Sequence, residues 1–310
     1  MISRLPTLYA NQRALDAMAQ RRSALTDTQL QLSTGKRVND PSDDPLAAVQ
    51  AERLRSQLAR IAIEQRMTGF ARQMLSTAES TLGQVGDSIQ FARESLVSAG
   101  NGALAPADRA LIAQQVRGVR DELVALANRR DGAGGYVFGG QGTTQAPFDA
   151  LDGTPIDPAA PGAPGTHPGE QQTGLDTDWS TSQNGRAVFL DADGSTLFEA
   201  LDTVIGWLED ADASDTQITA ALTAAADRLD TALERTLLAR TRAGEQLRAI
   251  DAHESALGGG ELDVRERLSD LVDLDFAAAL SEFQNNQTVL GAAMQTYAQI
   301  ARMSLFDYLR

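Results

Sequence analysis

Apolar side chains recur in alternating steps of three and four residues near both ends of the chain. The first series consists of Leu8, Asn11, Leu15, Met18, Arg22, Leu25, Gln29 and Leu32. The second series consists of Phe276, Leu280, Phe283, Gln287, Leu290, Met294, Tyr297, Ala301 and Ser304. This spacing puts the series on one face of a helix and is typical of a coiled-coil seam. It predicts a helix from about Leu5 to Leu32 and another from Phe276 onward.

Two more helices are predicted in the first half of the chain. Asp44 has the short acceptor side chain of an N-cap, and Pro45 suits the first helical position because no N–H donor is needed there. The apolar pattern predicts a helix over 45–99 and a second over about 108–130, with Gly100-Asn101-Gly102 between them. Such a short connection makes the two helices antiparallel neighbours.

Helical patterning returns near Thr196 and is strongest over about 216–257. Gly258, Gly259 and Gly260 then follow one another, and glycine is a poor helix former. We therefore expect this helix to end at the three glycines.

The middle of the chain has a different composition. Six of the ten prolines and eleven of the 26 glycines lie between residues 132 and 174. The β-favouring runs 136–138 and 186–190, with turn dipeptides such as Asn184-Gly185, predict a small, mostly β module. Residues 141–200 carry one basic side chain against nine acidic ones, so the module is also strongly acidic.

Composition excludes several kinds of chemistry. The chain has no cysteine and two histidines, His167 and His253, so it has no thiolates and too few histidines for an ordinary zinc site. A net charge of −15 disfavours a nucleic-acid-binding surface, which needs basic side chains. The sequence contains no apolar run of about 18 residues, so no transmembrane helix is predicted. The N-terminus lacks the pattern of a secretory signal. We therefore expect no cofactor, no metal, no nucleic-acid partner and no membrane insertion.

Two weaker motifs have ordinary structural explanations. The glycine-rich segment 132–135 is not followed by the Gly-Lys-Ser/Thr of a phosphate-binding loop. The acidic residues Asp191, Asp193 and Glu199 miss the ligand spacing of an EF-hand and suit a β-turn better. We expect no catalytic activity, and an enzyme in the acidic module would require a pocket with converging polar groups.

The C-terminal helix predicts a contact between subunits. Between Phe276 and Ala301 the only charged residue is Glu282, whereas an exposed helix usually carries many charges on its outer face. The alternative is an ordinary helix in a monomeric bundle. The N-terminal series has the same period, so we expect the two ends to pair as a coiled coil. The expected assembly residues are Leu8, Leu15, Met18, Leu25, Leu32, Phe276, Leu280, Phe283, Leu290, Met294, Tyr297, Leu305 and Phe306.

Three separated motifs follow one another along the chain. The first comprises Ser33, Thr34, Gly35, Lys36, Arg37, Asn39, Pro41, Asp43, Asp44 and Pro45, directly after Leu32. The second runs from Asp131-Gly132 through Tyr136-Val137-Phe138-Gly139-Gly140 to Ala146-Pro147-Phe148, and the third from Met303 to Leu309. Together they resemble the flagellin superfamily and, within it, the flagellar hook-filament junction proteins of the hook-associated protein 3 type. In the first motif, Gly35 also fits the left-handed residue that ends a helix.

The resemblance implies a structural protein without catalysis. Junction proteins of this family form a self-associating ring between the hook-side junction protein, hook-associated protein 1, and the flagellin filament. The resemblance also implies an extracellular place in the flagellum, export by the flagellar type III system, and an export chaperone that covers the C-terminal helix. A filament-forming flagellin is the alternative within the same superfamily.

The expected fold class is mainly α. We expect an elongated, flagellin-like coiled coil and helical bundle, with a small β-rich inserted domain and paired N- and C-termini. The expected parts are a terminal coiled-coil base of 1–44 and 262–310, a helical bundle of 45–140 and 197–261, and the acidic β-rich insert 141–196.

Overall fold

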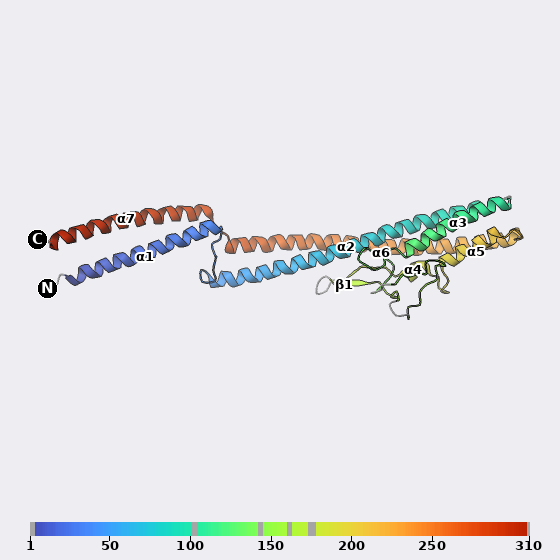
Figure 1. Cartoon of the computed structure of the whole chain (residues 1–310), viewed down its shortest axis with the longest axis horizontal. Coiled ribbons are helices and arrows are strands. Elements are labelled where there is room, and N and C mark those ends of the chain that lie inside the picture. Colours follow the sequence, from blue (N-terminus) through green and yellow to red (C-terminus); the bar gives the residue numbers. More distant parts are fainter. Residues whose placement is uncertain (1–3, 101–104, 142–144, 160–162, 173–177, 309–310) are drawn as a thin grey trace. The chain divides into compact units, whose positions relative to one another are not determined.

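The computed structural model describes residues 4–100, 105–141, 145–159, 163–172 and 178–308, and it is mainly helical (Figure 1). The elements in chain order are α1 (Arg4–Thr34), α2 (Pro45–Ala99), α3 (Pro106–Ala127), β1 (Glu170–Gln172), β2 (Asp178–Ser180), α4 (Gly185–Phe189), α5 (Leu197–Glu209), α6 (Asp215–Val272) and α7 (Phe276–Tyr308). The fold class is therefore the one predicted from the apolar periodicity.

The chain divides into two compact units, which we describe separately. The terminal unit comprises Met1–Ile61 and Gly258–Arg310, and the central unit comprises Ala62–Leu257. Helices α2 and α6 each contribute one part to each unit. The acidic segment 141–196 lies within the central unit, and the three-part division drawn from the sequence stays a prediction.

In the terminal unit, α1 and α7 lie side by side (Figure 1). The chain after α1 is joined to the connection between α6 and α7 by backbone hydrogen bonds. Arg37 N donates to Val272 O at 2.7 Å, and Leu274 N donates to Gly35 O at 3.0 Å. These bonds hold the end of α1 next to the start of α7, so residues far apart in the sequence form one local structure.

In the central unit, α2 and α6 run antiparallel. Arg93 on α2 pairs with Asp230 on α6 at 2.8 Å, and Glu79 pairs with Arg240 at 2.7 Å. Arg72, earlier in α2, pairs with Asp251 further along α6. Residue numbers rise along one helix as they fall along the other, which defines the antiparallel direction.

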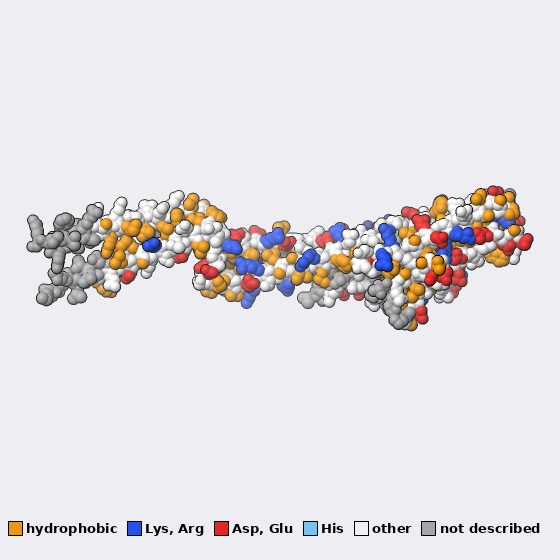
Figure 2. Space-filling view, in the orientation of Figure 1, with side chains coloured by type: hydrophobic (Ala, Val, Ile, Leu, Met, Phe, Trp, Pro, Cys, Tyr) orange, Lys and Arg blue, Asp and Glu red, His pale blue; other side chains and the backbone are white. Residues whose placement is uncertain are grey.

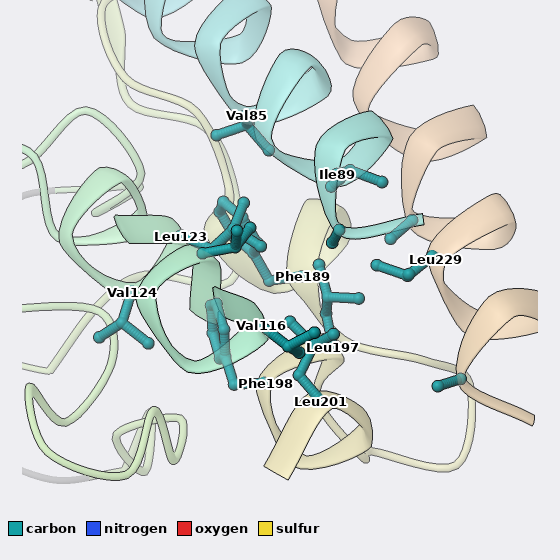
Figure 3. Packing of buried hydrophobic residues seen from close by; sticks show 14 of the residues in the cluster. Val85, Ile89, Val116, Leu123, Val124, Phe189, Leu197, Phe198, Leu201 and Leu229 are labelled. Atoms are coloured by element: carbon teal, nitrogen blue, oxygen red, sulfur yellow. The ribbon is translucent and has the colours of Figure 1, made fainter. Parts of the chain in front are cut away.

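The core of the central unit joins α2, α3, α5 and α6 (Figure 3). Figure 3 shows Val85 and Ile89 from α2, Val116 and Leu123 from α3, Leu197, Phe198 and Leu201 at α5, and Leu229 from α6. These side chains are at most 2% exposed. Removal of so much apolar surface from water is the main force that stabilises such a bundle.

The acidic segment contains little regular strand. β1 and β2 pair antiparallel with Gln171 opposite Trp179. The prediction of a strand at 186–190 is wrong, because these residues form most of α4. Its N-cap Asn184 accepts a hydrogen bond from Arg186 N at 3.0 Å. The prediction of a strand at 136–138 is also wrong, since Tyr136 makes only an isolated bridge, to Arg130.

The rings of Phe138, Phe148, Phe189 and Phe198 hold this segment to the bundle. Phe189 contacts the other three rings, with centroids 5.2 to 5.6 Å apart. All four rings belong to the same apolar core as α2, α3, α5 and α6. The acidic segment is therefore packed onto the bundle through a shared core.

The predicted helix end at Gly258–Gly260 is wrong. Helix α6 is continuous from Asp215 to Val272 and includes all three glycines. The prediction rested on glycine propensity, which long flanking helical segments override.

Candidate assembly surface

The α1–α7 pair buries few of its own side chains. Of the described side chains on α1, only Thr28 is buried, and on α7 only Ala279 and Asn286 are. Two helices in contact shield only a narrow stripe of each other from water. Much of the remaining apolar surface of the described part of the pair is open to solvent.

The centre of the pair is polar. Arg21 Nη1 on α1 donates to Asn286 Oδ1 on α7 at 3.0 Å, and Asn286 is only 3% exposed. Thr28 Oγ1 donates to Ala24 O in its own helix at 2.8 Å. The sequence pattern points to polar interruptions at other positions and misses Arg21 and Asn286. A buried asparagine fixes register because only one alignment gives it a partner.

The predicted assembly residues lie on these two helices with varied exposure. Leu15 is 50% exposed on α1, and Phe276, Leu280 and Met294 are 56%, 49% and 56% exposed on α7. The half-buried members are Met18, Leu25, Leu32, Phe283, Leu290 and Tyr297. Leu8, Leu305 and Phe306 belong to the same helices, and their side chains lie outside the described ones.

Figure 2 shows hydrophobic side chains gathered on α1 and α7, with few charges between them. Contiguous apolar surface of this kind marks a site of protein contact. On α7, Glu282 is the only charged residue from Phe276 to Ala301. The chemistry of this surface therefore suits helix packing, and its pairing with other chains stays a prediction.

A tight turn at the first motif ends α1. Gly35 has φ +69°, the left-handed conformation that the sequence predicts for it, and its N–H bonds to Gln31 O at 2.8 Å. Phe276 Cζ would lie 3.5 Å from a Cβ placed on Gly35, so the first residue of α7 packs against this turn. Arg37 Nη2 donates to Leu271 O at 2.7 Å and adds a side-chain link to α6.

Two carboxylates hold the rest of the motif. Asp43 accepts hydrogen bonds from Asp40 N at 2.9 Å and Asn39 N at 3.0 Å, and these bonds lower its pKa. Asp44 accepts from Ala47 N at 3.0 Å, which lowers the pKa of Asp44 and makes it the predicted N-cap of α2. Both effects stabilise the charged form of the carboxylate.

The other motif residues support the turn in smaller ways. Thr34 Oγ1 donates to Leu30 O at 3.0 Å and accepts from Lys36 N at 3.3 Å. Asn39 Nδ2 donates to Lys36 O at 3.2 Å. Pro45 is the first residue of α2, as predicted. Nothing in the structure explains the identities of Ser33 and Pro41.

The central unit contains a cavity of about 560 Å³ that is lined by α2, by the loop after α3 and by the acidic segment. It is lined partly by Phe70, Met74, Asp131 and Ser182. The Asp131 carboxylate accepts from Gly135 N at 2.9 Å, and the Ser182 hydroxyl donates to a backbone carbonyl at 2.6 Å. These two polar groups hold loops in place. Within the part of the chain that the structure describes, no group of three or more acidic or histidine side chains fits a metal ion.

The turn at Asp191 and Asp193 is held by arginines. Asp191 pairs with Arg235 at 2.8 Å, and Asp193 lies 3.6 Å from Arg228. A hydrogen bond from the Ser195 hydroxyl lowers the pKa of Asp193. This turn matches the sequence interpretation.

Among the helices of the described residues, none is long and apolar enough to cross a membrane.

Fold and surface together define a flagellin-like helical subunit with an apolar helix pair at its chain termini. The sequence model of the bacterial flagellin N-terminal helical region matches residues 5–143. The fold is similar to the crystal structure of Xanthomonas campestris FlgL, with a TM-score of 0.60 over 69% of this chain and 99% of that one, at 19% identity.

Sequence comparison then gives the particular family. The chain is 35% identical to flagellar hook-associated protein 3 of Salmonella typhimurium, over 90% of this chain and 91% of that protein. Polar flagellin F of Vibrio parahaemolyticus is 27% identical over only 43% of this chain and 36% of its own length. The chain therefore belongs to the flagellar hook-associated protein 3 family, whose members are structural components of the flagellum.

Proposed function

We propose that this chain is a subunit of the adaptor ring at the hook-filament junction, on which the flagellin filament assembles. The observation that carries the proposal is the apolar α1–α7 pair, where described side chains such as Leu15, Phe276 and Met294 are at least half exposed. Exposed apolar surface on paired helices is favourable only when other helices cover it. In the ring, those helices belong to neighbouring copies, to flagellin and to hook-associated protein 1.

Leu8, Leu15, Met18, Leu25 and Leu32 then pack with Phe276, Leu280, Phe283, Leu290, Met294 and Tyr297 across the assembled core. Leu305 and Phe306 of α7 take part in the same contacts between chains. An export chaperone covers this helix before the chain leaves through the flagellar type III system. In this role the protein is structural and has no catalysis.

Deletion of the gene, followed by electron microscopy of the cells and assay of the medium for flagellin, tests the proposal. Bare hooks with flagellin leaking into the medium are the expected result. Cells that still carry normal filaments would contradict the junction role.

Two matched variants sharpen the test by restoring the gene with one changed leucine. Leu15→Asp puts a charge on the apolar face of α1, where Leu15 is 50% exposed. Leu151→Asp puts the same charge on a leucine of the central unit that is 86% exposed. We expect bare hooks with Leu15→Asp and filaments with Leu151→Asp. Equal behaviour of the two variants would count against a special role for the terminal helices.

The alternative is a filament-forming flagellin, and growth of long filaments from the purified chain would support it. The partial overlap with polar flagellin F disfavours this alternative. We expect the purified chain to form no filaments without flagellin.

A further inference from the structure

Three consecutive glycines lie inside a long helix. Gly258, Gly259 and Gly260 belong to α6, which runs unbroken from Asp215 to Val272. Each glycine in a helix interior makes the helical state less favourable than alanine does, by about fivefold in the equilibrium constant. Three in succession therefore favour local opening on the order of 100-fold more than three alanines would.

Neither packing nor backbone geometry requires these glycines. A Cβ placed on any of the three would meet no heavy atom within 4 Å. None of the three is among the glycines with a positive φ. Alanine would fit at each position, so the property that glycine adds here is freedom of the backbone.

The surroundings of the triplet hold the helix weakly. On α6, no side chain is buried between Ile250 and Val264, and every residue of that stretch is described. On α2, no side chain is buried between Ala51 and Thr68. Helices open locally where few buried contacts hold them, so both long helices are least secured over these stretches.

The ion pairs of α6 have different partners before and after the three glycines. Before the triplet, Glu254 of α6 pairs with Arg72 of α2. After it, Glu261 pairs with Arg265 and Asp263 with Arg267, both within α6 itself. The boundary between the two compact units also falls between Leu257 and Gly258. Packing, ion pairing and composition thus all change within one short stretch of α6.

We propose that Gly258–Gly260 are a built-in opening point of α6, at which the helix transiently loses its hydrogen bonds and changes direction. The flanking segments stay helical because their buried and paired side chains hold them. A change in the direction of α6 during assembly is a consequence that rests on the proposed function, whereas the opening itself does not.

Native-state hydrogen exchange of the full chain, read by mass spectrometry, tests the opening. Amides of residues 256–264 should exchange faster than those of 240–250, where α6 is anchored by Ile250. In Gly258→Ala/Gly259→Ala/Gly260→Ala, exchange at 256–264 should slow by about 100-fold. The matched control is Gly69→Ala/Gly118→Ala/Gly244→Ala, which changes three other helical glycines whose Cβ positions are equally open.

The control should leave exchange at 256–264 unchanged, although it adds the same three methyl groups to helices. Equal protection of 256–264 and 240–250 in the unaltered chain would overturn the proposal, as would equal slowing by both triple variants. Restoring the deleted gene with each triple variant separates the two claims. Normal filaments with the Gly258–Gly260 variant would overturn the role in assembly, and bare hooks with that variant alone would support it.

Discussion

The two units of this chain use apolar side chains in opposite ways. The twelve largest fully buried side chains among the described residues all lie in the central unit. In the terminal unit, every buried apolar side chain among the described residues is alanine or valine. The described leucines, phenylalanines and methionines of this unit are half-buried or exposed instead. One unit completes its core within the chain, and the other keeps large apolar groups on its surface.

Charge separates the two units as clearly. The terminal unit has 13 basic and 14 acidic residues, a net charge of −1, and the central unit has 14 basic and 28 acidic, a net charge of −14. Nearly all of the net charge thus lies on the unit with the complete core. A high net charge disfavours association between copies, and a near-zero charge with apolar surface favours it. The difference in charge favours association through the terminal unit and disfavours association through the central unit.

The largest expected effect is on assembly. Deletion of Leu305–Arg310 removes the end of α7 and should abolish filament attachment completely. Unfolding of the central unit by urea should not change, because its core includes no residue of α7. Trp179 and Trp207, the only two tryptophans, both lie in the central unit, so their fluorescence reports its unfolding alone. Filaments in cells that carry this truncation would contradict the role of the terminal unit in assembly.

A pair of leucine substitutions tests whether the central unit, and not the terminal unit, is stabilised by buried leucines. Leu229→Ala in the central core, where Leu229 is 0% exposed, should lower the free energy of unfolding by about 2–5 kcal/mol. Leu15→Ala on α1, where Leu15 is 50% exposed, should change it by less than about 0.5 kcal/mol. Urea titration followed by far-UV circular dichroism measures both, since it reports helix in both units. Comparable losses would mean that α1 is secured within the monomer.

The helices and the first turn were predictable because their signals are local. Apolar periodicity predicts the helix α2, and Asp44 and Pro45 act as the N-cap and first residue that their chemistry indicates. Gly35 has the positive φ that its place after α1 suggests. Each of these features depends on neighbours within a few positions.

Two other features were missed because distant contacts decide the structure there. The run 186–190 has β-favouring residues, but the Asn184 cap and the burial of Phe189 among other aromatic rings stabilise a helix. The apolar seam predicts which helices pair, but a single pair buries small and polar side chains, such as Ala279 and Asn286. The extent of burial depends on how many helices meet, and periodicity carries no such information.

A smaller effect concerns the turn that joins α1 to α7. Gly35→Ala forces a side chain into the left-handed region and should destabilise the turn by about 1 kcal/mol. The amide protons of Arg37 and Leu274, which bond across the turn, should then exchange about fivefold faster. The control is Gly291→Ala in α7, where a Cβ meets nothing within 4 Å and φ is not positive. Unchanged exchange with Gly35→Ala would show that the turn adds little to the terminal unit.

The smallest effect is a pH dependence of the same turn. The pKa of Asp43 is lowered by the N–H groups of Asp40 and Asn39, and that of Asp44 by the N–H of Ala47. A carboxylate with a lowered pKa stabilises the fold above its unfolded pKa, and this stabilisation is lost as the pH falls through the folded value. The terminal turn should therefore loosen below about pH 4.

The central unit also has a lowered carboxyl pKa, at Glu209 beside Arg117. Its buried core should keep that unit folded after the turn has opened. In a titration followed by two-dimensional NMR, the amide signals of Asn39 and Asp40 should move before the indole N–H signals of Trp179 and Trp207. Asp43→Asn removes the titrating group at nearly constant size and should abolish the early shift. If the indole signals moved first, acid would weaken the central unit before the turn. That result would contradict the prediction that the buried core keeps the central unit folded.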